Sequence, residues 1–259
     1  MKAERSGVAI NADLGESFGS WQMGNDEALM PLIDTANVAC GFHAGDPLIL
    51  RNTLRLAKKT GVEVGAHPSF PDLVGFGRRY MALSKDELSA CIAYQLAAFS
   101  GMARQEGLRM AHVKPHGALN NAACADRSLA DVVAGAIAAF DPETILLAPA
   151  LSQLYEAGVA AGLKVAAEIF ADRTYQDDGQ LTPRSQPHAM VHGAEAASAH
   201  VRAMLQAGGI VAHSGKILPA PITSICVHGD GKEAVAFAAM LRANLKAEGY
   251  ELKGLTALM

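Results

Sequence analysis

The sequence predicts an α/β protein folded as an irregular (β/α) barrel of about seven parallel strands. Short apolar runs rich in β-branched residues alternate along the 259 residues with longer stretches of helical spacing. This alternation is typical of βα units around a parallel sheet. The apolar runs are nearly continuous, as in strands buried on both faces. A chain of this length is about the size of one barrel, so we expect a single domain over residues 1–259. The alternative fold is a doubly wound open sheet.

The strand candidates are bounded by turn residues and by the helical stretches that follow them. Seven are strong and one is weak. The strong candidates are residues 8–14, 36–41, 62–67, 110–115, 144–148, 164–170 and 224–229, and the weak one is 209–213.

The helical stretches carry their own start and stop signals. Asp46 followed by Pro47 predicts an N-cap with proline at the first helical position, opening a helix over 48–59. Ser84 and Glu87 have the spacing of a capping box, which opens a long helix ending near residue 107. The remaining helices are predicted over residues 127–139, 152–161, 194–206 and 232–248. Two connections, 68–83 and 171–192, are long and polar, and such loops in a compact domain are usually functional or disordered.

Charge, cysteines and hydropathy exclude several classes of protein. A net charge of −4 and a pI of about 6.1 argue against a nucleic-acid partner. The four cysteines are far apart and form no CxxC pair, which indicates reduced thiols rather than a zinc site or a disulfide framework. Residues 1–7 are charged and lead directly into a strand pattern, and no apolar run is long enough to span a bilayer. We therefore expect a cytoplasmic protein without a membrane partner.

Polar residues gather where the predicted strands end. Because the carboxyl ends of parallel strands open on one face of a barrel, these side chains should converge on a common site. They are Asp13 and Glu16 after the first strand, His43 after the second, His67, Lys114 and His116 after the next two, Glu168, Asp172 and Arg173 at the sixth, and His228 and Asp230 at the seventh.

Several of these residues are hard to explain by a structural role alone. Asp13 ends an apolar strand, where a buried carboxylate needs a partner. Three histidines at equivalent strand ends beside it favour a shared site. A lysine at the end of a buried strand is unfavourable unless it is paired or its pKa is lowered, and Lys114 could pair with Glu168 or Asp13. His112 lies inside a strand at a different phase, which favours a structural role. Arg78 lies in a glycine-rich loop that can bring a cation to an anionic ligand.

Familiar nucleotide-binding and hydrolase motifs are absent from the sequence. There is no G-x-S-x-G elbow, no Rossmann G-x-G-x-x-G and no H-E-x-x-H. The segment from Gly209 to Lys216 has one residue too many between its glycines for a Walker A loop, and Ile217 follows the lysine.

Six separated groups of residues, in order along the chain, strongly resemble the LamB/YcsF family. They are 10–16 (INADLGE), 37–47 (NVACGFHAGDP), 65–68 with 75–79 (GAHP and GFGRR), 113–119 (VKPHGAL), 168–173 (EIFADR) and 227–230 (VHGD). The resemblance runs from about residue 8 to about residue 250. It implies a barrel similar to those of the polysaccharide deacetylases.

The resemblance also implies an activity. It is the ATP-dependent opening of the lactam of 5-oxo-L-proline to L-glutamate, performed together with 5-oxoprolinase subunits B and C, which are expected to bind part of the ATP. A lactam is a poor electrophile, so water attack needs a general base and an oxyanion stabiliser. The residues expected to act in catalysis are Asp13, His43, His67, Lys114 and His116. Those expected to bind substrate are Glu16, Arg78, Glu168, Asp172 and Arg173, with Arg173 or Arg78 on its carboxylate.

The resemblance also implies that some of the same residues could bind a divalent metal. Deacetylase-like barrels bind an ion through one aspartate and two histidines, and the matching positions are Asp13, His67 and His116. Two alternative functions stay open: a metal-dependent deacetylase-like hydrolase, and a non-catalytic substrate-binding subunit whose partners perform the chemistry.

Overall fold

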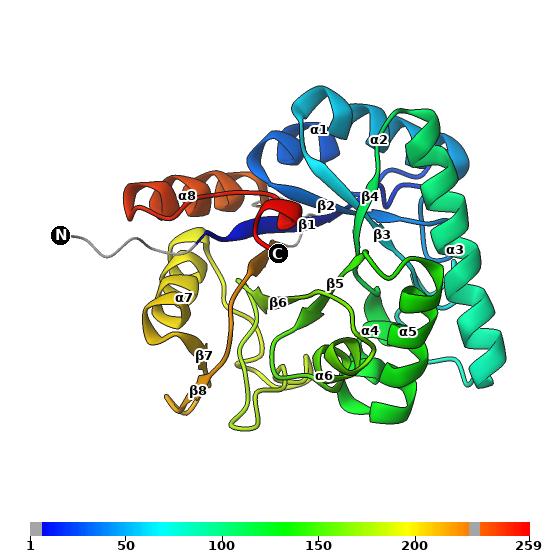
Figure 1. Ribbon diagram of the computed structural model, residues 1–259. Helices are drawn as coiled ribbons and strands as arrows, with labels where there is room; N and C mark the ends of the chain where they lie inside the picture. Colours follow the sequence, from blue (N-terminus) through cyan, green and yellow to red (C-terminus); the bar gives the residue numbers. More distant parts are fainter. Residues whose placement is uncertain (1–6, 228–233) are drawn as a thin grey trace.

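Parallel strands close into a barrel in the computed structural model, which describes residues 7–227 and 234–259 (Figure 1). β9 pairs with both β6 and β1, and this pairing closes the sheet. In spatial order the strands are β1 (Ala9–Leu14), β2 (Thr35–Ala39), β3 (Glu63–His67), β4 (Met110–Val113), β5 (Ile145–Pro149), β6 (Val165–Phe170) and β9 (Ser224–Val227). The predicted barrel of about seven parallel strands is confirmed, and the doubly wound alternative is wrong.

Helices follow the strands and cover the outside of the barrel (Figure 1). None of those in the described part of the chain is long and apolar enough to cross a bilayer. The α-helices are α1 (Asp26–Leu29), α2 (Pro47–Thr60), α3 (Lys85–Gln105), α4 (Gly117–Ala125), α5 (Arg127–Phe140), α6 (Gln153–Ala160), α7 (Ala194–Ala207) and α8 (Ala234–Ala247), with 3-10 turns at Met30–Leu32 and Leu255–Ala257.

The predicted helix caps are present. The Asp46 carboxylate accepts hydrogen bonds from the backbone N–H groups of Leu48 and Ile49 at the start of α2. Ser84 and Glu87 form the capping box of α3. Because capped first turns satisfy backbone donors that have no partner inside the helix, these signals could be recognised from sequence.

Two predictions differ from the structure, and a third concerns residues outside the described part of the chain. The weak candidate at 209–213 forms β7 (Gly209–Val211), but it pairs antiparallel with β8 (Ile217–Pro219) outside the barrel, because β6 and β9 already bond to each other. α4 was not predicted, since its N-cap residue, His116, makes no side-chain capping bond. The predicted strand end at 228–229 and the start of the last helix lie outside the described residues, as do His228 and Asp230.

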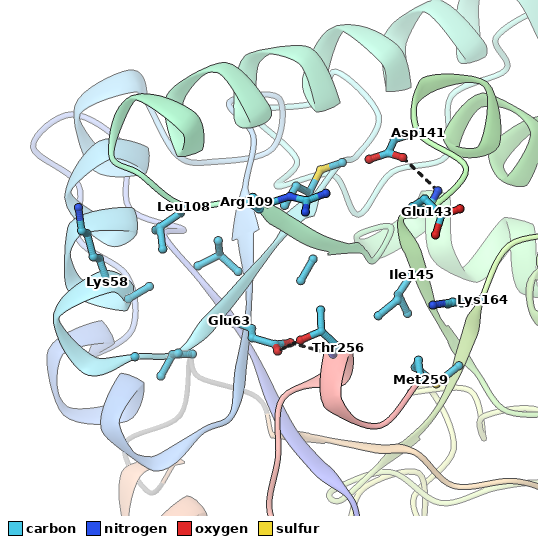
Figure 2. Close-up of a pocket in the computed structure, with 16 residues that line it drawn as sticks. Lys58, Glu63, Leu108, Arg109, Asp141, Glu143, Ile145, Lys164, Thr256 and Met259 are labelled. Atoms are coloured by element: carbon cyan, nitrogen blue, oxygen red, sulfur yellow. Dashed lines mark hydrogen bonds between the residues drawn. The ribbon is translucent and has the colours of Figure 1, made fainter.

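The two ends of the barrel differ in chemistry. The amino-terminal end is filled by an apolar cluster made of Ala9, Ile145, Leu147, Ala166 and Leu255. A cavity of about 440 Å³ lies beside it, with Glu63, Arg109 and Lys164 among its lining side chains (Figure 2). None of the described residues lining this cavity is a histidine or a cysteine. The predicted site residues lie at the opposite, carboxyl end of the strands.

Candidate functional site

A second cavity, of about 260 Å³, opens at the carboxyl ends of the strands and holds most of the predicted site residues. The loops 68–83 and 171–192 form parts of its wall. Its lining includes the predicted residues Asp13, Glu16, His67, Arg78, Lys114, His116 and Arg173. The expectation that strand ends converge on one site is therefore confirmed for these residues.

The other three predicted residues lie around this cavity rather than on its surface. Glu168 is fully buried beneath Lys114, with 2.8 Å between Oε1 and the lysine Nζ. His43 is buried, and its ring stacks on His116 with centroids 3.7 Å apart. Asp172 is half-buried, and its backbone carbonyl accepts a hydrogen bond from Val191.

Lys114 is the cation at the centre of the site. Its Nζ lies 3.1 Å from Asp13 Oδ1 and 3.2 Å from Cys226 Sγ, in addition to its contact with Glu168. Burial alone would lower the pKa of Lys114, but Asp13, Cys226 and Glu168 together hold it well above its usual value. The side chain therefore stays an ammonium ion, and the prediction that it pairs with Asp13 or Glu168 is confirmed for both.

The tautomers of His67 and His116 follow from their backbone contacts. His67 Nδ1 lies 2.6 Å from the carbonyl oxygen of Lys114, and His116 Nε2 lies 2.8 Å from that of Phe76. A carbonyl can only accept, so both of these nitrogens carry protons. In the neutral rings the remaining nitrogens, His67 Nε2 and His116 Nδ1, then carry lone pairs, yet they lie only 3.0 Å apart. Such an approach requires a cation between them, either a proton or a metal ion.

Carboxylates surround this pair of nitrogens. Asp13 Oδ2 lies 3.4 Å from His67 Nε2, and Glu16 Oε1 lies 3.5 Å from His116 Nδ1. Burial lowers the pKa of His67, but Asp13 and Glu16 together raise it overall. Burial and the neighbouring imidazoles lower the pKa of His116 well below its usual value. Of the two rings, His67 is thus the one whose surroundings favour the protonated form.

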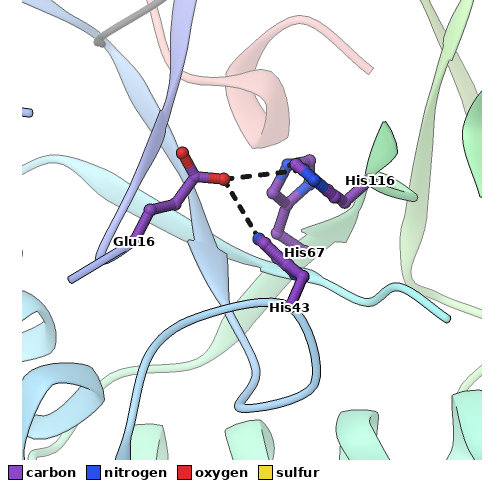
Figure 3. Close-up of side chains that lie close together, drawn as sticks. All are labelled: Glu16, His43, His67 and His116. Atoms are coloured by element: carbon purple, nitrogen blue, oxygen red, sulfur yellow. Dashed lines mark hydrogen bonds and ion pairs between the residues drawn. The ribbon is translucent and has the colours of Figure 1, made fainter. Parts of the chain in front are cut away.

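Glu16, His43, His67 and His116 form the group whose chemistry suits a metal ion (Figure 3). One ligand atom from each lies within 4.8 Å of all the others. His67 and His116 fit well, because each donates its second N–H to a carbonyl, as metal-bound histidines usually do. His43 fits less well. Its Nε2 lies 3.0 Å from Glu16 Oε1, but its Nδ1 is buried without a partner in the described structure, which suits a lone pair better than an N–H.

Of the three predicted metal ligands, His67 and His116 belong to this group of four. Asp13 lies outside the group and reaches it through its contact with His67.

Arginines line the outer part of the cavity. Arg78 stacks over the ring of Phe76, 5.0 Å from its centroid, and comes from the 68–83 loop. Arg173 and Arg184 come from the 171–192 loop. Arg173 is only 8% exposed, and burial followed by the nearby Arg184 lowers its pKa. Sequence reasoning misses Arg184, although it identifies the loop that carries it.

His112 departs from its predicted orientation. It lies opposite Gly65 in the β3–β4 register and contacts Asn37 and Thr35 inside the barrel. It therefore shares the inward phase of Lys114, two residues away, and the prediction of a different phase is wrong. The sequence signal for this polar interior is the pair of asparagines, Asn11 and Asn37, within otherwise apolar strands.

The chain is similar to several known proteins over nearly its whole length. The LamB/YcsF family model matches residues 8–259. A relative from Azoarcus sp. (strain BH72), named as the A subunit of 5-oxoprolinase, is 56% identical over 248 residues, covering 96% of this chain and 97% of the relative. The crystal structure of the lactam utilization protein from Thermus thermophilus has a TM-score of 0.91 and 42% identity, covering 96% of this chain and all of that one.

The fold extends to more distant proteins. The catalytic domain of a peptidoglycan N-acetylglucosamine deacetylase from Eubacterium rectale ATCC 33656 has a TM-score of 0.51 at 12% identity, covering 99% of this chain and 90% of that domain. The predicted likeness to deacetylase barrels is thus confirmed for the fold. The match over residues 8–259 and the full-length relative show that the chain belongs to the LamB/YcsF family.

Proposed function

We propose that this chain is the A subunit of a 5-oxoprolinase, which opens the lactam of 5-oxo-L-proline to L-glutamate with two partner subunits and ATP. The observation that carries the proposal is a full-length relative of that name at 56% identity. The small cavity of this chain supports it, because carboxylates, histidines, a lysine and arginines line that cavity. ATP-dependence and the partners, subunits B and C, are proposed from the resemblance to the family.

The reaction adds water across the amide bond. The C–N bond of the lactam breaks, the water oxygen bonds to the carbonyl carbon, and the ring nitrogen takes up a proton. Asp13 is proposed as the general base, because its Oδ2 faces His67 while its Oδ1 is held by Lys114. Lys114 is proposed to stabilise negative charge that develops on the carbonyl oxygen. When no metal is bound, His67 and His116 are proposed to carry the proton that the ring nitrogen needs.

The arginines are proposed to bind the substrate carboxylate. Arg173 and Arg184 lie on one loop and Arg78 on the other, and an arginine can hold a carboxylate through two parallel hydrogen bonds. Glu168 is fully buried against Lys114, which favours a supporting role over contact with substrate.

A divalent metal is proposed to bind at His67 and His116 together with Glu16, with Asp13 beside them. When bound, such an ion polarises a carbonyl oxygen and lowers the pKa of water. The two lone pairs that face each other support this proposal.

The test is glutamate formation from 5-oxoproline and ATP. We expect activity with all three subunits, and none with this chain alone or with the partners alone. Asp13→Ala and His116→Ala should abolish turnover in the complete enzyme. The matched controls are Asp131→Ala and His213→Ala, because both residues are exposed and neither lines the cavity.

Two results would overturn the proposal. Full activity from the partner subunits by themselves would make this chain dispensable for the chemistry. Release of acetate from an N-acetylated sugar by this chain without ATP would identify a deacetylase.

A further inference from the structure

A chain of buried polar side chains crosses the barrel interior beneath the cavity. It starts at Thr35, passes through His112 and Asn37, and reaches Asp13. Thr35, His112 and Asn37 are completely buried. They are too deep to line the cavity, and the proposed reaction leaves them without a role.

The direction of every hydrogen bond in this chain can be deduced from its last member. Asp13 is a carboxylate beside the Lys114 ammonium and can only accept. The Asn37 atom 2.8 Å from Asp13 Oδ1 is therefore the amide nitrogen, which also donates to Asn11 Oδ1 at 2.8 Å. Asn37 Oδ1 must then point away from Asp13, toward His112.

The same logic fixes the tautomer of His112. Its Nε2 lies 2.7 Å from Asn37 Oδ1, an acceptor, so Nε2 carries the proton. Burial lowers the pKa of His112 to about 3, so the ring is neutral and Nδ1 carries a lone pair. The Thr35 hydroxyl, 3.2 Å from Nδ1, is consequently the donor. Thr35 thus supplies the donor that the Nδ1 lone pair of this tautomer needs. The Nε2 proton of this tautomer opposes a half-turn rotation of the Asn37 amide, because that rotation would bring the amide N–H group against it.

The other end of the network agrees with this assignment. Asn11 donates to Glu168 Oε1 at 2.9 Å and to Ser224 Oγ at 2.8 Å, which leaves Asn11 Oδ1 to accept from Asn37 and from Lys114. Asp13 and Glu168 are carboxylates that can only accept, and these two groups fix the directions of the hydrogen bonds between them.

We infer that Thr35 and His112 are positioning residues for the reaction proposed above: they lock the Asn37 amide, which holds Asp13 with Oδ1 occupied and Oδ2 toward His67. The inference rests on the proposed catalytic role of Asp13. Asp13 Oδ1 accepts from both Asn37 and Lys114, whereas Oδ2 is the oxygen near the facing histidine nitrogens. If the Asn37 amide rotated by half a turn, its oxygen would face Asp13 Oδ1, and the Asp13 carboxylate would no longer be held in this orientation.

The chain offers a matched pair of threonines for the test. Thr35→Val removes only the hydroxyl that donates to His112 Nδ1, and Thr35→Ser restores it. Thr144→Val is the control, because the Thr144 side chain is also buried but its hydroxyl has no partner in the described structure. Should Thr35→Val not fold, Thr35→Ala makes the same comparison.

Turnover of the three-subunit enzyme is the first measurement. Losing one buried hydrogen bond from a catalytic network is expected to lower kcat about tenfold in Thr35→Val. KM should stay near the wild-type value, since no group that touches substrate has changed. Thr35→Ser and Thr144→Val should keep the wild-type kcat.

The second measurement is the tautomer itself. Long-range ¹H–¹⁵N NMR on the histidine-labelled chain at pH 7 should show His112 protonated only at Nε2, and a mixture of tautomers in Thr35→Val. A wild-type His112 protonated at Nδ1, or an equal kcat in Thr35→Val and Thr144→Val, would overturn the inference while leaving the proposed function intact. A wild-type enzyme that forms no glutamate would overturn both.

Discussion

His67 and His116 meet through nitrogens that both carry lone pairs when the rings are neutral. The other nitrogen of each ring donates its proton to a backbone carbonyl, so neither ring can supply a proton between the two facing nitrogens without losing that hydrogen bond. The 3.0 Å approach is stable only with a cation between the two atoms. At the scale of single residues, this contact is what makes the site a proton or metal carrier.

Zinc titrated into the purified chain should bind with one-to-one stoichiometry. Binding should release protons, because the metal replaces the proton shared by the two rings. His116→Ala should weaken the affinity on the order of 100-fold, since a ligand and its oriented lone pair are both lost. Calorimetry at pH 7 in two buffers of different ionisation enthalpy measures affinity and proton release together.

A second histidine pair supplies the control for this titration. The exposed rings of His188 and His213 stack at 3.9 Å and are the competing place for a metal. His213→Ala should leave the tight binding unchanged. Binding that survives His116→Ala, or that disappears with His213→Ala, would contradict the assignment.

Buried neutral histidines should make the protein less stable in weak acid. His112 stays neutral in the folded chain down to about pH 3, but it takes up a proton near pH 6.5 when unfolded. Below pH 6.5 the unfolded state therefore binds more protons, and the free energy of unfolding falls as the pH falls. His112 alone should account for a loss of about 2 kcal/mol at pH 5.

Urea denaturation between pH 5 and pH 7.5 measures how the free energy of unfolding changes with pH. His43 and His116, with lowered pKa values, act in the same direction, whereas His67, with a raised pKa, opposes them. In His112→Asn, the slope of the free energy of unfolding against pH, measured below pH 6, should be smaller by about 1.4 kcal/mol per pH unit. Equal slopes in the variant and the wild type would show that His112 is already protonated in the folded protein.

At the scale of elements, strand β3 leaves room for the side chains of β4. Gly65 pairs with His112 in the sheet, and a methyl group added at Gly65 would lie 2.4 Å from atoms of the imidazole ring. The strand therefore needs a residue without a side chain at this position. A glycine inside a strand often marks such a close approach.

Two glycine-to-alanine variants should change stability in opposite directions. Gly65→Ala should lower the free energy of unfolding by about 1–3 kcal/mol, because it overpacks the His112 ring. Gly101→Ala should raise it by about 0.5–1 kcal/mol, because Gly101 lies on the exposed face of α3 with open space around it. Urea denaturation of both variants at pH 7 gives the two values. A Gly65→Ala protein as stable as the wild type would mean that the His112 ring can move aside without lowering the free energy of unfolding.

At the scale of the whole molecule, the two long connections bring arginines to one cavity. Arg78 is on the 68–83 loop, and Arg173 and Arg184 are on the 171–192 loop. Both loops follow strands at the same end of the barrel, so their length serves the site rather than the core. Arg173 is anchored by its bond to the Thr182 carbonyl, at 2.7 Å.

Arg184→Gln should weaken substrate binding without slowing the chemical step. Losing a hydrogen bond to a charged group is expected to raise KM for 5-oxoproline about tenfold, with kcat near the wild-type value. Arg202→Gln is the control, because Arg202 is exposed on α7 and pairs with Glu248. Steady-state kinetics of the three-subunit enzyme separates KM from kcat. An unchanged KM in Arg184→Gln would exclude this arginine from carboxylate binding.

Much of the fold follows from local signals in the sequence. The strands of the barrel are apolar runs, and α2 and α3 begin at capping residues whose hydrogen bonds stay within one turn. The small β7–β8 sheet and α4 were not predicted correctly, because the pairing of β7 depends on how β6 and β9 close the barrel and α4 lacks a capping side chain.

For the site, the order of residues along the chain was enough to predict the residue types and the face on which they meet. Parallel strands all point their carboxyl ends the same way, so Asp13, His67 and Lys114 had to converge once the strands were assigned. Which atoms face each other is a property of the folded chain alone. Hydrogen-bond directions, tautomers and the burial of Glu168 depend on distances of about 3 Å between strands far apart in sequence, and no pattern along one strand contains those distances.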